Sequence, residues 1–135
     1  MMHEIIVFVV VSENSKIKFM RSTKEVWEHH CIAFANANID EVMLDFAEDS
    51  VYITTNKVIR GRENIRELYD SHFKTLEKDS LSTIVSQTLE GEIVFFEWTF
   101  ESPTIMIMDG VDTFIIRNGY IVAQTMRSTP VSKTK

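Results

Sequence analysis

An aspartate within a run of apolar residues is the strongest candidate for chemistry in this chain of 135 residues. Asp112 stands in the segment Val111-Asp112-Thr113-Phe114 of an expected β-strand. Alternation along that strand places Asp112, Phe114 and Met108 on one face if no bulge intervenes. A carboxyl group that faces an apolar interior has its charged form disfavoured, which suits it to donate or accept a proton. The alternative is an ordinary aspartate that pairs with a neighbouring side chain or turns toward solvent.

Two adjacent histidines are the next candidates, because a histidine changes its charge near neutral pH. The helical spacing puts His30 on the same side as Trp27 and Phe34, and it turns His29 toward solvent. A pair formed by His30 and Asp112 would combine a base with a carboxylate that orients it, so both are predicted as catalytic residues. The alternative for His30 is a hydrogen-bonded histidine of the core.

A stripe of mostly aromatic side chains is expected to line an apolar pocket beside these two residues. Core packing alone also explains such a stripe. The histidines lack the spacing of metal ligands, so no metal site and no cofactor are predicted. The predicted ligand-binding residues are Trp27, Phe34, Tyr52, Thr54, Trp98, Phe100, Met108 and Phe114.

The composition is that of an ordinary globular domain, with 44% apolar and 25% charged residues. A net charge of -6 argues against nucleic acid and against an anionic membrane surface, since both need clustered basic side chains. Cys31 is the one cysteine, which excludes an intramolecular disulfide and predicts a cytoplasmic location. The apolar run from Ile5 to Val11 is too short to span a bilayer.

The elements that must position the candidate residues follow from the periodicity of the chain. A first helix is predicted to begin at Ser22 or Thr23, and a second short helix to be capped by Asp40. A strand near 51–54, a partner strand near 58–60 and a third helix after Gly61 come next. The rest predicts a consecutive antiparallel meander with strands at 81–90, 93–101, 105–117 and 120–127.

Three helices packed on a curved antiparallel sheet make an α+β layout in a single domain. The meander is expected to bend at Asp109-Gly110 and to turn at Asn118-Gly119, the strongest hairpin signal of the chain. We divide the chain into residues 1–22, an N-terminal extended segment, residues 23–128, the domain itself, and residues 129–135, a tail that is expected to be frayed from Pro130 onward.

Five motifs, in this order and spacing, resemble those of a known superfamily. The segment from Thr23 to Arg127 resembles the nuclear transport factor 2-like superfamily, in particular its SnoaL-like and ketosteroid isomerase-like branch. The resemblance implies a cone-shaped α+β barrel with a pocket at its open end, and a homodimer through the outer face of the sheet. Members include isomerases, cyclases, dehydratases and hydrolases, and also proteins that only bind ligands or scaffold assemblies. The motifs are FANANID at 34–40, LDFAEDSV at 44–51, IRGRENI at 59–65, VDTF at 111–114 and RNGYI at 117–121.

Transferred residue by residue, the resemblance supplies one of three catalytic parts. Asp112, in an Asp-x-Phe context, matches the aspartate that ketosteroid isomerases keep protonated so that it donates to the developing oxyanion. The general-base position falls on Thr54, whose hydroxyl is no base near neutral pH. The position of the oxyanion tyrosine falls near His30 or Cys31. The expectation is an isomerase, cyclase or dehydratase that uses acid–base catalysis on a small apolar or aromatic molecule. The alternative is a non-catalytic ligand-binding or dimerisation domain.

Overall fold

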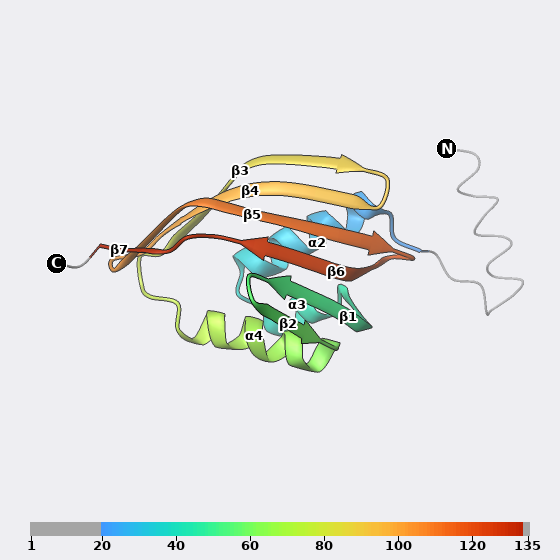
Figure 1. Ribbon diagram of the computed structural model, residues 1–135. Coiled ribbons are helices and arrows are strands. Elements are labelled where there is room, and N and C mark those ends of the chain that lie inside the picture. The colour runs from blue at the N-terminus through green and yellow to red at the C-terminus, as the bar shows by residue number, and fades with distance from the viewer. Residues whose placement is uncertain (1–19, 134–135) are drawn as a thin grey trace, which may run out of the picture.

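The computed structural model of the chain describes residues 20–133. The predicted N-terminal segment therefore lies almost wholly outside the described residues, as does the end of the predicted tail. Three helices and a curved, mixed sheet of seven strands make an α+β fold (Figure 1). The helices are α2 (Thr23–Ala35), α3 (Ile39–Met43) and α4 (Arg62–Lys74). The strands are β1 (Phe46–Thr54), β2 (Lys57–Arg60), β3 (Leu81–Glu90), β4 (Ile93–Glu101), β5 (Ile105–Arg117), β6 (Tyr120–Arg127) and β7 (Val131–Ser132).

The first two helices begin at side chains that cap their free backbone N–H groups. The hydroxyl of Ser22 accepts from the backbone N–H of Glu25, and the Glu25 carboxylate accepts from the backbone N–H of Ser22. This reciprocal box confirms the predicted start of α2. The cap of α3 is Asn38, so the prediction of Asp40 was wrong. The left-handed residue between the two helices is Ala37, with φ 51°.

The sheet runs in the order β2-β1-β6-β5-β4-β3, and β7 pairs with β5. Strand β1 begins at Phe46, before the predicted start at Val51, and it pairs in parallel with β6. The predicted meander, β3 to β6, is antiparallel throughout. The sheet as a whole is mixed, because the chain leaves the β1–β2 hairpin through α4 and returns to β1 only with β6. Figure 1 shows α4 beside that hairpin and α2 behind the longer strands. Contacts of α2 with β4 and β5, and of α4 with β1, place the helices on one face, the inner face.

The inner face carries the core, and the alternation of each strand decides which side chains join it. Phe114 on β5 and Val94 on β4 are cross-strand partners that are both fully buried. From the helices, Val26 and Ile65 meet them in the same cluster. The sheet and the helices thus share one core, and any polar group on the inner face must find its partners within it.

A bulge bends β5 at the predicted place. The register of β4 against β5 shifts just after Trp98, which lies opposite Gly110. A Cβ atom at Gly110 would collide with the indole ring of Trp98, so only glycine fits beneath that ring. The bulge also turns Met108 outward, where it is 69% exposed. Met108 therefore does not share the face of Asp112, because the alternation is interrupted between them.

The C-terminal strands are joined as predicted, but the tail is not frayed over its whole length. Asn118 and Gly119 both have positive φ, 54° and 82°, as the two central residues of a type I′ turn require. Beyond β6, Val131–Ser132 forms β7 and pairs with the start of β5. The prediction of a frayed tail was wrong at these two residues, where pairing to an open strand edge outweighs the polar composition.

Candidate functional site

Asp112 lies on the inner face and is 5% exposed. Trp98 Nε1 donates to Asp112 Oδ1 at 2.7 Å, and Gln124 Nε2 donates to Asp112 Oδ2 at 2.8 Å. Burial raises the pKa of Asp112 to about 6, although these two hydrogen bonds act in the opposite direction. Both donors are uncharged. The site therefore holds a carboxyl group that can change its protonation state near neutral pH.

Two residues that the sequence did not single out complete a polar chain. The hydroxyl of Tyr69 on α4 donates to Gln124 Oε1 at 2.7 Å, so Tyr69, Gln124 and Asp112 are linked in series. Burial raises the pKa of Tyr69 well above its usual value and also raises that of Tyr52 nearby. The Asn118-Gly119 turn fixes the pairing of β5 with β6 next to the turn, and this was the one sequence signal that bore on Gln124. It was not enough to place Gln124 beside Asp112, because a bulge between Ile115 and Ile116 shifts the register by one residue.

His30 lies in the core but is not joined to Asp112 by a hydrogen bond. It is 5% exposed and makes ring contacts with Phe114 at 4.9 Å and Tyr69 at 5.9 Å between centroids. Its Nδ1 is buried without a hydrogen-bond partner in the described part of the chain. Burial, and secondarily the charge of His29, lowers the pKa of His30 to about 3. The imidazole is therefore neutral and a weak base near neutral pH.

The other predicted ligand-binding residues are divided between the core, the sheet end and the surface. Trp27, Tyr52 and Phe114 are buried, whereas Phe34, Thr54, Trp98 and Phe100 are half-buried and Met108 is exposed. His72 on α4 is exposed, but its ring also stacks on Phe34 and lies edge-on to Phe100. These three rings form an aromatic rim at one end of the inner face.

Two hollows on the surface lie outside the polar chain. One, of about 350 Å³, is on the outer face and is lined in part by Phe95, Thr113 and Arg127. The other, of about 380 Å³, lies beside the bulge and is lined in part by Met106 and Met108. Neither of these two hollows is lined by Asp112 or His30.

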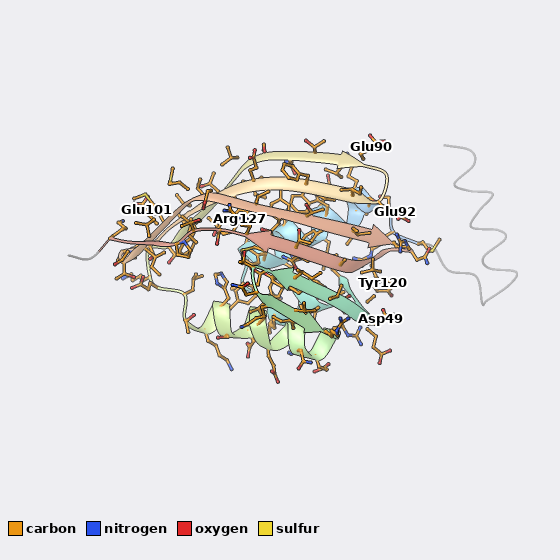
Figure 2. All side chains as sticks on the ribbon, viewed as in Figure 1. Asp49, Glu90, Glu92, Glu101, Tyr120 and Arg127 are labelled. Carbon is orange, nitrogen blue, oxygen red and sulfur yellow. The ribbon has the colours of Figure 1, made fainter. Side chains whose placement is uncertain are left out.

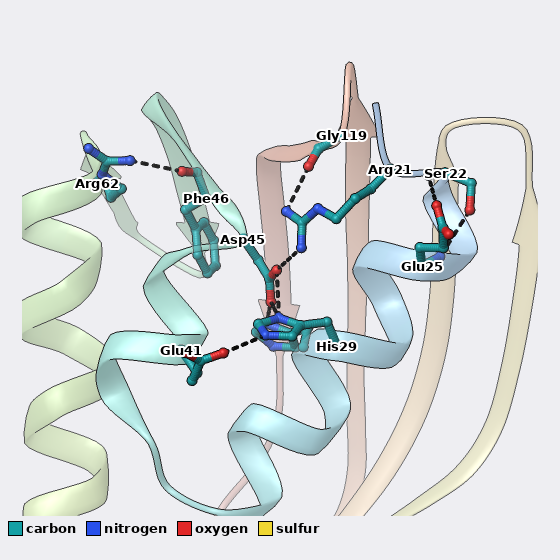
Figure 3. Close-up of polar contacts among 10 residues, drawn as sticks. Arg21, Ser22, Glu25, His29, Glu41, Asp45, Phe46, Arg62 and Gly119 are labelled. Carbon is teal, nitrogen blue, oxygen red and sulfur yellow. Dashed lines mark hydrogen bonds and ion pairs between the residues drawn. The ribbon is translucent and has the colours of Figure 1, made fainter. Parts of the chain in front are cut away.

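A second polar cluster, formed by Arg21, His29, Glu41 and Asp45, joins the start of the domain to its turns (Figure 3). Asp45 is fully buried and accepts from Arg21 Nη1 at 2.7 Å, while Arg21 Nη2 donates to the carbonyl of Gly119 at 2.8 Å. His29 Nδ1 lies 2.8 Å from both oxygens of Asp45, and His29 Nε2 lies 2.8 Å from Glu41 Oε1. The side chain of His29 is one-third exposed, so the prediction that it meets solvent holds only in part: Asp45 and Glu41 also bind its ring.

The cluster requires the charged form of His29. A neutral imidazole has one N–H and one bare nitrogen, but both ring nitrogens of His29 face carboxylate oxygens. Only the imidazolium donates at both positions. Hydrogen bonding to Asp45, then to Glu41, accordingly raises the pKa of His29 above 6.5.

The raised pKa predicts how His29 stabilises the fold with pH. Its contribution is fully present below the unfolded value of 6.5 and is lost as the pH rises through the higher folded value. We expect the free energy of unfolding of the wild type to exceed that of His29→Gln at pH 6, and the difference to shrink toward pH 9. Chemical denaturation at several pH values measures it. His72→Gln is the control, because burial lowers the pKa of His72. A difference that stays constant from pH 6 to pH 9 would contradict the imidazolium bridge.

Three further properties bear on the predicted chemistry. In residues 20–133, no group of three or more His, Cys, Asp or Glu side chains is arranged to hold a metal ion. Cys31 is a free thiol whose pKa is raised to about 11, mainly by burial. Within the same span, every helix is too short or too polar to cross a membrane.

Comparisons with known proteins agree with this fold. A family model described as a SnoaL-like domain matches residues 27–124. No curated protein matches the chain. An NTF-2 like protein of unknown function from Burkholderia xenovorans is 19% identical, with a TM-score of 0.69 over 84% of this chain and 87% of that one.

Two other similar structures are those of a hydrolase and of a protein bound to a small ligand. An LEH-like epoxide hydrolase from M. tuberculosis is 18% identical, with a TM-score of 0.64 over 79% of this chain and 82% of that one. A protein with a ketosteroid isomerase-like fold from Catenulispora acidiphila, in complex with trimethylamine, is 19% identical. Its TM-score is 0.62 over 76% of this chain and 83% of that one. At such low identity these similarities show the fold.

Proposed function

Because the chain belongs to the SnoaL-like family, within the nuclear transport factor 2-like superfamily, we propose that it is an isomerase, cyclase or dehydratase. It moves a proton on a small, mainly apolar molecule at Asp112. The observation that carries the proposal is a buried carboxyl group whose pKa is about 6 and whose oxygens are held only by uncharged N–H donors. A base with a pKa near the working pH combines a useful fraction of the carboxylate with a useful affinity for the proton.

The hydrogen bonds favour one of the roles open to Asp112. Both Trp98 and Gln124 donate to it, and donors stabilise the carboxylate form. Asp112 therefore begins the reaction as a base that accepts a proton, rather than as the donor to an oxyanion. The proposal gives His30 no proton-transfer role, since a pKa of about 3 leaves its ring neutral and weakly basic. Tyr52 and Trp98 are the residues that position the molecule.

Entry to Asp112 is proposed from the aromatic rim. The sheet and helices would form a cone, and the molecule would enter at the end where Phe34, Phe100 and Trp98 are half-buried. Aromatic faces at this end suit a small apolar or aromatic molecule. Because Asp112 is buried from solvent, entry requires the rim side chains to move apart. The free Cys31 thiol supports a cytoplasmic protein, and no cofactor enters the proposal.

Turnover of three probes tests the catalytic proposal. Cyclohex-3-en-1-one reports proton removal and return, 3-hydroxycyclohexanone reports dehydration, and 4,5-epoxypentan-1-ol reports ring closure by attack of its hydroxyl group on its own epoxide. We expect turnover of at least one probe, with a rate that rises through pH 6 as Asp112 ionises. Binding of each probe is followed in parallel by the melting temperature, which a ligand of the folded state raises. No turnover and no thermal shift with any probe would contradict the proposal and favour a non-catalytic domain.

The alternative function, association of two copies through the outer face of the sheet, is favoured by the pattern of that face. Phe95 and Ile53 are each 42% exposed there. The cross-strand row Glu97–Val111–Arg127 places a negative and a positive side chain on either side of an apolar one. Figure 2 shows Arg127 over β5 and β6, while Glu90 and Glu92 lie at the end of the sheet near the β3–β4 turn.

The same row gives the alternative a geometry and a test. A two-fold axis parallel to the strands, near Val111, would set Glu97 of each copy against Arg127 of the other. We therefore expect the wild type to sediment as a homodimer and Arg127→Glu to dissociate it, since like charges would then face each other. The double variant Glu97→Arg, Arg127→Glu should restore the dimer in sedimentation equilibrium. A wild-type monomer at micromolar concentration would contradict this association.

A further inference from the structure

The orientation of the Gln124 carboxamide is set by its two neighbours. Its Oε1 accepts from Tyr69 Oη at 2.7 Å, and its Nε2 donates to Asp112 Oδ2 at 2.8 Å. Rotation of the carboxamide by half a turn would offer its oxygen to Asp112 and its NH2 group to Tyr69. That reversed arrangement needs a proton on Asp112, because two bare oxygens cannot share a hydrogen bond. Each protonation state of Asp112 therefore has its own arrangement of the chain.

The two arrangements differ at Tyr69. In the reversed one, Tyr69 Oη accepts from Gln124 Nε2, and the phenolic proton needs a new acceptor. Across residues 20–133 the hydrogen-bond partner of this hydroxyl is Gln124 alone, and Tyr69 is 6% exposed. A buried donor without an acceptor has lost its interaction with water and gained none in return. Protonation of Asp112 is therefore made less favourable by the loss of the hydrogen bond that the Tyr69 hydroxyl donates.

Trp98 determines which oxygen takes the proton. The indole N–H can only donate, so it cannot reverse, and Asp112 Oδ1 remains an acceptor in both states. A proton on Asp112 is therefore held on Oδ2, where the reversed carboxamide of Gln124 accepts it. Within residues 20–133, Tyr52 is also a titratable group near Asp112; its pKa is raised, so its hydroxyl stays neutral.

We infer that Tyr69 is a positioning residue that acts on Asp112 through Gln124. Its hydroxyl holds the carboxamide in the orientation that donates to Asp112 and so favours the carboxylate, the form that accepts a proton. The effect of Tyr69 on the pKa of Asp112 does not depend on the proposed function, but its consequence for catalysis rests on that function.

Titration of the Asp112 carboxyl by carbon NMR tests the inference in Tyr69→Phe. This variant removes only the hydroxyl, so protonation of Asp112 no longer leaves a donor without an acceptor. We expect the pKa of Asp112 to rise by about one unit relative to the wild type. In the wild type, the side-chain amide signals of Gln124 should change with the same pKa as the Asp112 carboxyl. An Asp112 pKa unchanged in Tyr69→Phe would overturn the inference.

Two controls separate an action through Gln124 from a general effect of losing a tyrosine hydroxyl. Tyr120→Phe, at an exposed tyrosine, should leave the Asp112 pKa unchanged. In a Gln124→Met background, which has no carboxamide to orient, Tyr69→Phe should cause no further shift. A full shift in that background would show that Tyr69 acts by another route. If Gln124→Met does not fold, the side-chain amide signals of Gln124 in Tyr69→Phe decide the same point. Without the Tyr69 hydroxyl the Gln124 carboxamide should no longer be held in one orientation, and these signals should report that change.

Kinetics distinguish failure of this inference from failure of the proposed function. If a probe is turned over, Tyr69→Phe should move the acid limb of the pH–rate profile to higher pH, by about one pH unit. The rate on the plateau should stay nearly unchanged. A purely structural role would lower the plateau without moving the limb. A shifted NMR titration without turnover would leave the positioning role intact and contradict the catalytic proposal. Turnover of a probe together with an unchanged Asp112 titration would support the catalytic proposal and contradict the positioning role.

Discussion

Asp45→Ala is expected to lower the free energy of unfolding by about 3 kcal/mol, the low end of the range for breaking a buried ion pair. Asp45 is fully buried, and its carboxylate holds Arg21 and His29 together. The low end applies because the side chains of both cations are about one-third exposed, 34% for Arg21 and 33% for His29, so water can reach them after the carboxylate is removed. The loss still releases α2, the residues before it and the Asn118-Gly119 turn from a common anchor.

Thermal unfolding measures this effect. For a chain of this length, about 3 kcal/mol corresponds to a drop of about 10 °C in melting temperature. Asp49→Ala is the matched control, because Asp49 lies shortly after Asp45, in β1, but is exposed. It should change the melting temperature little. Added salt should weaken the effect only slightly, because the Asp45 carboxylate is shielded from solvent. A melting temperature of Asp45→Ala within 2 °C of the wild type, roughly half a kcal/mol, would show that the cluster is not an anchor.

The elements that were predicted well are those whose signals are local. The capping box at Ser22 and Glu25 set the start of α2, and the positive-φ pair Asn118-Gly119 set the hairpin between β5 and β6. The turn and break residues Gly91, Ser102-Pro103 and Asn118-Gly119 gave the bounds of β3 to β6 as the structure has them. Each of these signals depends on a few residues close together in the chain, so no tertiary information is needed to read it.

The features that were missed depend on contacts between distant segments. The parallel pairing of β1 with β6 joins residues about 70 positions apart, such as Val51 and Ala123. The charged state of His29 is decided by Asp45 and Glu41, which the helical pattern of α2 cannot reveal. In each case the chain is consistent with the outcome, but nothing within a short window specifies it.

The candidate site shows the same division. Asp112 was identified from its apolar neighbours and from its Asp-x-Phe context, and the structure does bury it. Its partner Trp98 lies on the adjacent strand, within the predicted stripe. Gln124 and Tyr69 were missed, since one depends on a bulge and the other on how α4 packs against the sheet. The burial of the candidate carboxyl group could be anticipated from sequence, but its links to Gln124 and Tyr69 could not.

Asp112→Asn is expected to reduce turnover of any accepted probe by about 10²–10⁴-fold, the usual contribution of a positioned acid or base. Asparagine has nearly the same shape but cannot accept a proton at the relevant pH. It should also mimic protonated Asp112, with its oxygen toward Trp98 and its NH2 group toward Gln124. The carboxamide of Gln124 would then reverse, so its amide signals in this variant should resemble those of the wild type at low pH.

The pH dependence separates loss of the base from loss of the fold. In the wild type the rate should rise through pH 6 and then level, and in Asp112→Asn the residual rate should lack that limb. The pKa of Asp112 is about 6 in the folded state, whereas its ordinary value, which applies to the unfolded chain, is 3.8. The free energy of unfolding therefore falls as the pH rises from about 4 to about 6. Asp112→Asn removes this dependence, and unfolding measured at pH 4 and pH 7 should show it.

A matched aspartate on the same strand completes the test. Asp109→Asn changes an exposed side chain that accepts from the backbone N–H of Thr129, and it should leave the rate within about two-fold of the wild type. If Asp112→Asn folds and keeps the wild-type rate and its pH profile, the proton is transferred elsewhere. The buried carboxyl with its two N–H donors would then be a feature of the core, and association through the outer face would be the better account of the domain.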